Sequence, residues 1–197
     1  YETVKDFLQP VVKLWVVTIP LLAHYSKETR VAVLNAAAYC LVYLASAQAS
    51  LHAHRWERFC GDSERSAASL LTLFALLYLG LGGGLWGNVA VAAVGIFILM
   101  GLCQNLWRPI HIGRFDKAGD AKRGATILSV ESQAKHGAAA ILTPVLGYLI
   151  DRQQQIYGTE ALRAFWPLVL CAIFPILAVW RQYRQPVIEP ENTAEAA

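Results

Sequence analysis

Polar side chains that interrupt long apolar stretches are the first candidates for chemistry in this sequence. Between Val31 and Leu51 they recur at every third or fourth position, which places them on one side of a helix. They are Asn35, Tyr39, Tyr43 and Ser46. Such a face either lines a water-filled path for a substrate or forms hydrogen bonds with a neighbouring helix. The sequence leaves both interpretations open.

The segment from Gly124 to Ile150 carries two polar faces. One face contains Ser129, Ser132, Gln133 and His136. Roughly opposite, Glu131 and Lys135 have the i, i+4 spacing that favours an ion pair, and Arg108 or Arg123 is a further expected partner. This charged group is either a gate that breaks and re-forms or a solvated helix entrance. His136 either relays protons or packs through a hydrogen bond, as lone histidines more often do.

Other polar residues complete the candidate substrate path. Gln104 and Asn105 end another apolar segment, and Asp6 with Gln9 occupies a possible first membrane span. Polar groups inside a membrane are costly and are therefore default functional candidates. Ala139, Thr143 and Gly147 form a small-residue stripe that we interpret as a helix contact.

Motifs of known enzyme classes do not occur in the sequence. It has no HExxH zinc motif and no GxSxG nucleophile motif, and the glycines from Gly82 to Gly84 lie in an uncharged stretch unsuited to phosphate. We therefore expect neither an enzyme nor a cofactor. The cysteines lack CxxC spacing, which favours packing over metal binding. They are Cys40, Cys60, Cys103 and Cys171.

The composition indicates an all-α integral membrane protein. Of the 197 residues, 56% are hydrophobic and only 16% are charged, against about 25% charged in soluble domains. No Asp, Glu, Lys or Arg occurs from Ser66 to Trp107. A helix that crosses about 30 Å of hydrocarbon needs roughly 20 such apolar residues.

The apolar stretches predict five membrane spans. They are Val31–Leu51, Ser66–Gly82, Asn88–Trp107, Gly124–Ile150 and Arg163–Trp180. The long uncharged run is divided at a cluster of glycines with Asn88, because such residues mark turns, and Pro167 and Pro175 are expected to kink the last span. Before Val31, the sequence predicts either a span that ends near Pro10 and is followed by an interfacial helix, or one poorly marked span. With it the count is six.

The basic residues predict the orientation. One set of loops holds ten Lys and Arg residues: Arg55, Arg58, Arg65, Arg108, Arg114, Lys117, Lys122, Arg123, Arg181 and Arg184. The opposite set holds five: Lys13, Lys27, Arg30, Arg152 and Arg163. Since basic loops stay in the cytoplasm, we expect a multi-pass protein of the cell (inner) membrane with a cytoplasmic C-terminus. Residues 185–197 are expected to be a disordered tail. The basic residues behind the net charge of +3 are thus interpreted as signals for membrane orientation, and no nucleic-acid partner is expected.

Several stretches resemble a known family of transporters. They are DFLQP (Asp6–Pro10), Tyr39–Arg55, Arg108-Pro109, RGATILSVESQ (Arg123–Gln133) and TPVLGYLID (Thr143–Asp151). They resemble parts of the seventh, eighth, tenth and eleventh helices of a major facilitator superfamily (MFS) transporter. The resemblance covers most of the chain, to about Arg184.

The resemblance implies a twelve-helix fold of two six-helix halves around a central cavity, which moves small solutes by alternating access and commonly uses a proton gradient. Residues 1–184 would form the C-terminal half and would pair with a missing N-terminal half or with a second copy. Asp6, Gln9, Asn35 and Tyr39 would approach the cavity. Arg108, Arg123 and Glu131 would belong to the cytoplasmic gate. The alternative is a small helical membrane scaffold or assembly protein that transports nothing.

Overall fold

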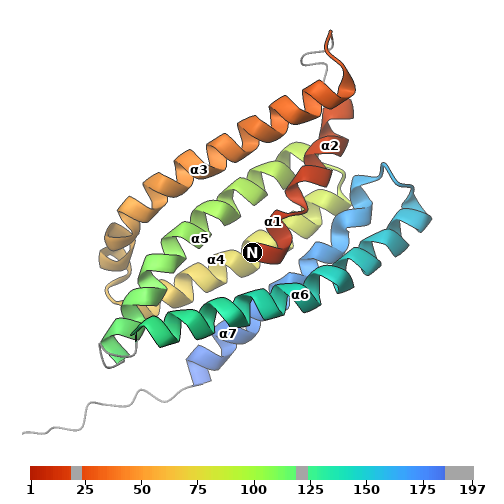
Figure 1. Cartoon of the computed structure of the whole chain (residues 1–197). Coiled ribbons are helices and arrows are strands. Elements are labelled where there is room, and N and C mark those ends of the chain that lie inside the picture. Colours follow the sequence, from red (N-terminus) through yellow and green to blue (C-terminus); the bar gives the residue numbers. More distant parts are fainter. Residues whose placement is uncertain (19–23, 119–123, 185–197) are drawn as a thin grey trace, which may run out of the picture.

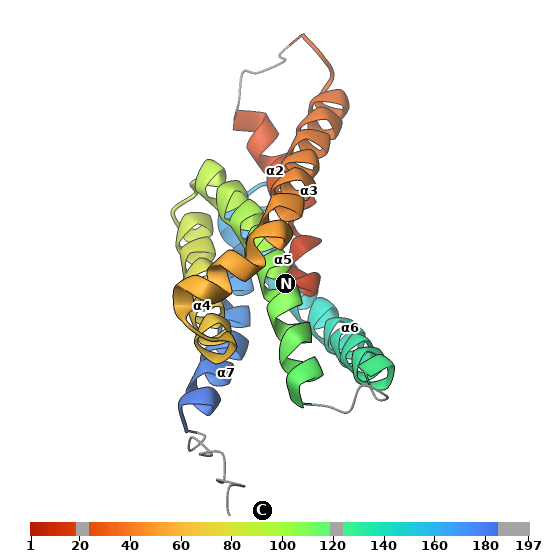
Figure 2. The same ribbon diagram turned by 90° about the vertical axis from the view of Figure 1, so that its left-hand side faces the viewer.

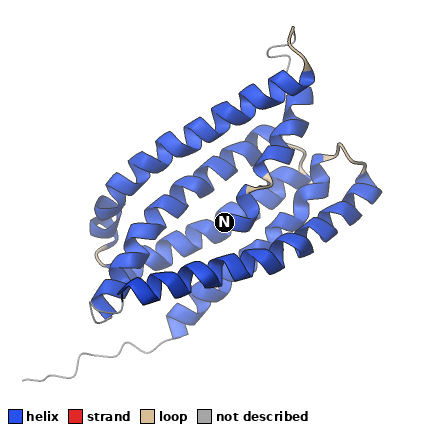
Figure 3. Cartoon of the chain, viewed as in Figure 1, coloured by secondary structure: helices blue, strands red, loops and turns tan. Residues whose placement is uncertain are grey.

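The computed structural model describes residues 1–18, 24–118 and 124–184, and within these ranges every regular element is a helix (Figure 3). The elements are α1 (Glu2–Lys5), α2 (Leu8–Thr18), α3 (Lys27–Cys60), α4 (Ser63–Trp86), α5 (Ala90–Ala118), α6 (Gly124–Tyr157), η2 (Leu162–Ala172) and α7 (Ile173–Arg184) (Figure 1). The predicted tail, 185–197, lies outside the described residues. The expectation of an all-α fold is confirmed.

Four helical segments in the described ranges are long and apolar enough to cross a membrane. They are Lys27–Cys60, Ser63–Trp86, Ala90–Gly113 and Leu162–Arg184. The expected span Gly124–Ile150 is helical, as part of α6, but it is not among them. Its uncharged stretch, 136–150, lies between Lys135 and Asp151. At 1.5 Å per residue it is about 22 Å long, which is short against a hydrocarbon core of about 30 Å.

The long helices lie alongside one another and alternate in direction (Figure 1). α3 packs mainly on α5, and α4 packs on α5 and on η2. Figure 2 shows α4 on one side of α5 and α6 on the other. The short α1 lies near the middle of the bundle, and apolar residues of α1 and α2, among them Val4, Leu8 and Val12, are fully or almost fully buried there.

Two sets of contacts define the ends of the bundle. At one end, the side-chain amide of Gln182 in α7 donates to the Glu64 backbone oxygen at 2.9 Å, next to the α3–α4 turn. This end carries the exposed arginines Arg55, Arg58, Arg65, Arg181 and Arg184, and we call it the basic end. At the opposite end, Trp86 packs edge-on against Tyr157 and Trp166.

The uncharged run divides inside the predicted cluster, at Gly87 and Asn88, but the preceding glycines do not take part in the turn. α4 continues through Gly80–Gly84 and ends at Trp86, and the turn is limited to Gly87–Val89, where Asn88 adopts a φ of 60°. Gly82 instead allows a close approach of α4 to η2, because an added Cβ would lie 2.6 Å from the Cβ of Val169. Small residues that let backbones approach are a main source of helix association in lipid.

The prolines also act differently from the predictions. No helix ends near Pro10. The chain bends at Asp6–Phe7, and Pro10 lies in the first turn of α2, where a missing N–H costs nothing. In the last span, Pro167 lies within the 3₁₀ segment η2, and Pro175 lies in the first turn of α7. The expected irregularity is therefore a change of helix type along Leu162–Arg184.

The outer surface of the bundle is largely apolar. Large side chains more than half exposed occur on α3, α4, α6 and α7, among them Leu44, Leu76, Ile141 and Leu177. Soluble monomers rarely expose contiguous apolar surface of this extent. Together with the four apolar helical segments, this surface indicates a membrane protein.

Candidate functional site

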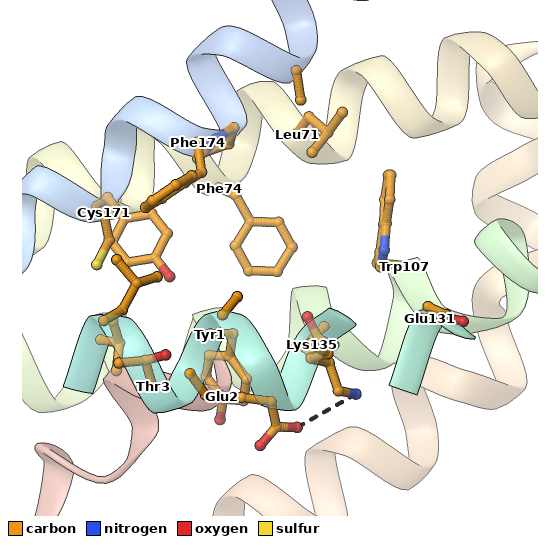
Figure 4. A pocket seen from close by; sticks show the side chains of 18 residues that line it. Tyr1, Glu2, Thr3, Leu71, Phe74, Trp107, Glu131, Lys135, Cys171 and Phe174 are labelled. Atoms are coloured by element: carbon orange, nitrogen blue, oxygen red, sulfur yellow. Dashed lines mark ion pairs between the residues drawn. The ribbon is translucent and has the colours of Figure 1, made fainter. Parts of the chain in front are cut away.

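The larger of two adjoining cavities lies between α1, α4, α5, α6 and the η2–α7 segment and has a volume of about 400 Å³. Aromatic side chains of α4, α5 and α7 and of Tyr1, which precedes α1, line it: Tyr1, Phe74, Tyr78, Trp107 and Phe174. The charged groups on its wall come from α1 and α6 and are Glu2, Glu131 and Lys135 (Figure 4). The cavity therefore has a mostly apolar wall with several aromatic rings, and it is charged on one side.

The smaller cavity, of about 190 Å³, lies between α1, α3, α5 and α6. Its polar lining includes Lys5, Tyr39, Tyr43, Ser46, Asn105 and Arg108. Tyr1, Glu2, Gln104 and Lys135 line both cavities. These shared residues form the boundary between an aromatic compartment and a polar one.

Glu2 is the centre of the charged group at this boundary. Its carboxylate forms an ion pair with Lys5 one turn along the chain, and its Oε1 lies 3.8 Å from the Nζ of Lys135 on α6 (Figure 4). The spacing of Glu131 and Lys135 favoured an ion pair between them, but the partner that the structure gives to Lys135 is Glu2. The two lysine side chains and that of Glu2 remain 29–42% exposed, so each single pair contributes little to stability.

The polar face of α3 serves two different purposes. Ser46 is buried and accepts a hydrogen bond at 2.9 Å from the Asn105 side-chain amide of α5, which also donates to the Gly101 carbonyl at 2.9 Å. Tyr39 and Tyr43 stack with ring centroids 6.4 Å apart and line the smaller cavity. This face thus forms an interhelical hydrogen bond at Ser46 and lines the smaller cavity at Tyr39 and Tyr43.

Asn35, one turn before Tyr39, is half-buried, and its Oδ1 has no hydrogen-bond partner in the structure. The other predicted path residues lie on the surface of the bundle. Asp6 and Gln9 are exposed around the start of α2, and Ser132 and His136 are exposed on α6.

The predicted gate residues are only partly assembled. Glu131 lines the larger cavity, Lys135 lines both cavities, and the exposed Arg108 lines the smaller one. Arg123 lies outside the described residues. The three described members therefore surround the same pair of cavities.

Sequence reasoning missed the aromatic wall and the contribution of the N-terminal segment. Phe74, Trp107 and Phe174 look like ordinary lipid-facing or packing residues in the sequence. A usable signal was present at Glu2 and Lys5, whose i, i+3 spacing favours an ion pair directly before the apolar α2.

No three His, Cys, Asp or Glu side chains gather into a possible metal site among residues 1–18, 24–118 and 124–184. The four cysteines are free thiols, and two of them, Cys103 and Cys171, are buried in the helix packing.

No model of a known protein family matches the chain, and no curated protein and no solved structure matches it either.

Proposed function

We propose that this protein is a secondary transporter that moves a small solute across the membrane by alternating access. One observation carries the proposal: Glu2, Gln104 and Lys135 line two adjoining cavities inside a bundle whose outer surface is apolar. Charged and amide groups are expensive at membrane depth, and they are retained mainly where they line a path for solutes or protons.

The proposed architecture is an MFS-type half. The α1–α2 pair and α6 would be two further spans beside the four apolar segments, and a second six-helix unit would complete the path. That unit would be either an N-terminal half or a second copy. The exposed polar residues Asp6, Gln9, Ser132 and His136 support such a partner, since lipid is a poor environment for them whereas a partner helix or a water-filled cavity satisfies them.

The protein is proposed to lie in the cell (inner) membrane. Its basic end would face the cytoplasm. Basic residues near span ends favour the cytoplasmic side. At the opposite end, Trp86, Tyr157 and Trp166 form an aromatic cluster of the kind enriched at membrane–water interfaces. We include coupling to a proton gradient because it is common in the transporter family that the sequence resembles.

Solute flux through the reconstituted full-length protein tests the proposal. Proteoliposomes are screened with a panel of charged and neutral small solutes, and the Gln104→Leu and Glu131→Gln variants are compared with the wild type. Leu76→Ala is the control, because Leu76 is 60% exposed on the apolar surface and lines neither cavity. Flux should fall at least tenfold in Gln104→Leu and persist in the control, at equal incorporation.

Unchanged flux in both cavity variants would contradict the proposed path. If no solute in the panel moves, and the cavity variants still assemble with the same partners as the wild type, the scaffold alternative explains the protein better.

A further inference from the structure

The charges around the smaller cavity do not balance. Lys5 and Lys135 share the single carboxylate of Glu2, and Arg108 lines the same space. Among the described residues of the lining, three basic side chains thus face one acidic side chain. A further anion would reduce this excess of positive charge, and a cation would increase the repulsion.

The uncharged groups of this lining also suit an anion. The hydroxyls of Tyr39 and Tyr43 and the side-chain amide of Gln104 can donate hydrogen bonds into the cavity. The arginine adds a planar fork of donors that matches a carboxylate. Hydrogen bonds from charged donors to an ionised oxygen are about twice as strong as neutral ones.

The adjoining larger cavity suits the opposite kind of group. Phe74, Trp107 and Phe174 face into it from three elements (Figure 4), and the Trp107 ring is held by stacking on His111 at a centroid distance of 4.9 Å. Aromatic walls favour flat apolar bodies through burial and ring stacking. Its volume of about 400 Å³ lies within the range of about 300–1,000 Å³ typical of small-molecule sites.

We infer that the solute is an amphipathic organic anion, with an aromatic or other flat apolar body in the larger cavity and a carboxylate-like group in the smaller one. This inference rests on the proposed function and adds the chemical class of the substrate. Glu131 fits this orientation, because it lines only the aromatic cavity and would repel an anionic group placed there.

Direct binding to the purified full-length protein tests the inference without requiring transport. Three probes share one ring system and differ in charge: 2-naphthylacetate, 2-naphthylacetamide and 2-(2-naphthyl)ethylamine. Their Kd values are measured by isothermal titration calorimetry in detergent at low and at physiological salt. We expect the acetate to bind at least tenfold more tightly than the amine, with the amide between them.

Charge-removing variants then locate the anionic group. Arg108→Gln and Lys5→Gln should each raise the Kd of the acetate roughly three- to tenfold, the scale of one charge-assisted hydrogen bond at a partly exposed site. They should leave the Kd of the amide within twofold, which also shows that the variants are folded. Arg58→Gln and Lys13→Gln are the matched controls, because both residues are exposed and line neither cavity.

The Glu131→Gln variant distinguishes a negatively charged substrate from a positively charged one. The inference predicts equal or tighter binding of the acetate, since a repelling charge is removed. Preferential binding of the amine, or loss of probe binding in Glu131→Gln, would overturn the assignment to anions and leave the proposed transport standing. If none of the three probes binds, the inference also fails, while flux of another solute still decides the proposed function.

Discussion

Replacing Gly82 with alanine tests the packing of α4 against η2, two elements that contribute to the wall of the larger cavity. A Cβ at residue 82 would lie 2.6 Å from both the Cβ and the Cγ2 of Val169. Carbon atoms that touch without strain are about 3.5–4.0 Å apart. Rotation of the valine side chain can move Cγ2 but not Cβ, so the two helices must separate by about 1 Å.

The expected cost follows from this geometry. Adding a methyl group to a packed helix contact costs about 1–3 kcal/mol, and the higher figure applies here because the backbone has to move. The neighbouring Gly83 is a matched control, since nothing lies within 4 Å of a Cβ built on it. Gly83→Ala should be neutral or should gain up to about 1 kcal/mol from the higher helix propensity of alanine.

The measurement is the free energy of unfolding of the full-length protein in mixed micelles, titrated with a denaturing detergent. Because the propensity gain is common to both variants, Gly82→Ala should be less stable than Gly83→Ala by the overpacking cost alone, about 2–3 kcal/mol. The double variant Gly82→Ala/Val169→Gly should recover part of the loss, because it removes the atoms in conflict. Equal stability of the two alanine variants would refute the close approach of α4 to η2.

Two further predictions concern hydrogen bonds at the span ends and between spans. In a double-mutant cycle, Asn105→Ala and Ser46→Ala should show a coupling free energy of about 0.6 kcal/mol and at most about 1.7 kcal/mol, as for other interhelical bonds in lipid; zero coupling would mean that the 2.9 Å bond is absent. Asp62 caps α4 by accepting the Arg65 backbone N–H at 2.6 Å. Asp62→Ala should therefore lower the free energy of unfolding by about 1 kcal/mol. Asp62→Ser should lower it much less, because serine can also cap the helix. Equal losses in the alanine and serine variants would argue against a capping role.

The helices could be predicted from the sequence because the bilayer imposes a strong local rule. The uncharged run from Ser66 to Trp107 and the apolar stretch after Val31 each predicted helices that the structure contains. The run divides inside the predicted cluster, but Gly80–Gly84 misled the prediction of where the first helix ends, which is Trp86 and not Gly82, because glycine has the same sequence signature whether it forms a turn or allows close helix contact. Only the position of Val169 on the neighbouring element distinguishes the two cases.

The candidate site could be predicted only where local spacing was sufficient. The polar face at Tyr39 and Tyr43 and the charges at Glu131 and Lys135 are recognisable in the sequence, and these residues line the cavities. The ion partner of Lys135 was not predictable, because Glu2 is distant in the sequence and approaches only through the tertiary fold. The same holds for the aromatic wall, whose members come from separate helices.

Access to Gln104 from the two sides of the membrane tests the central claim most directly. In a variant whose native cysteines are replaced, Gln104→Cys is treated with a membrane-impermeant maleimide in right-side-out and in inverted vesicles. Leu76→Cys is the control, since a thiol in hydrocarbon does not form the reactive thiolate. Alternating access predicts labelling of residue 104 from both sides and of residue 76 from neither. Labelling of residue 104 from one side only, or from neither, would contradict transport through these cavities.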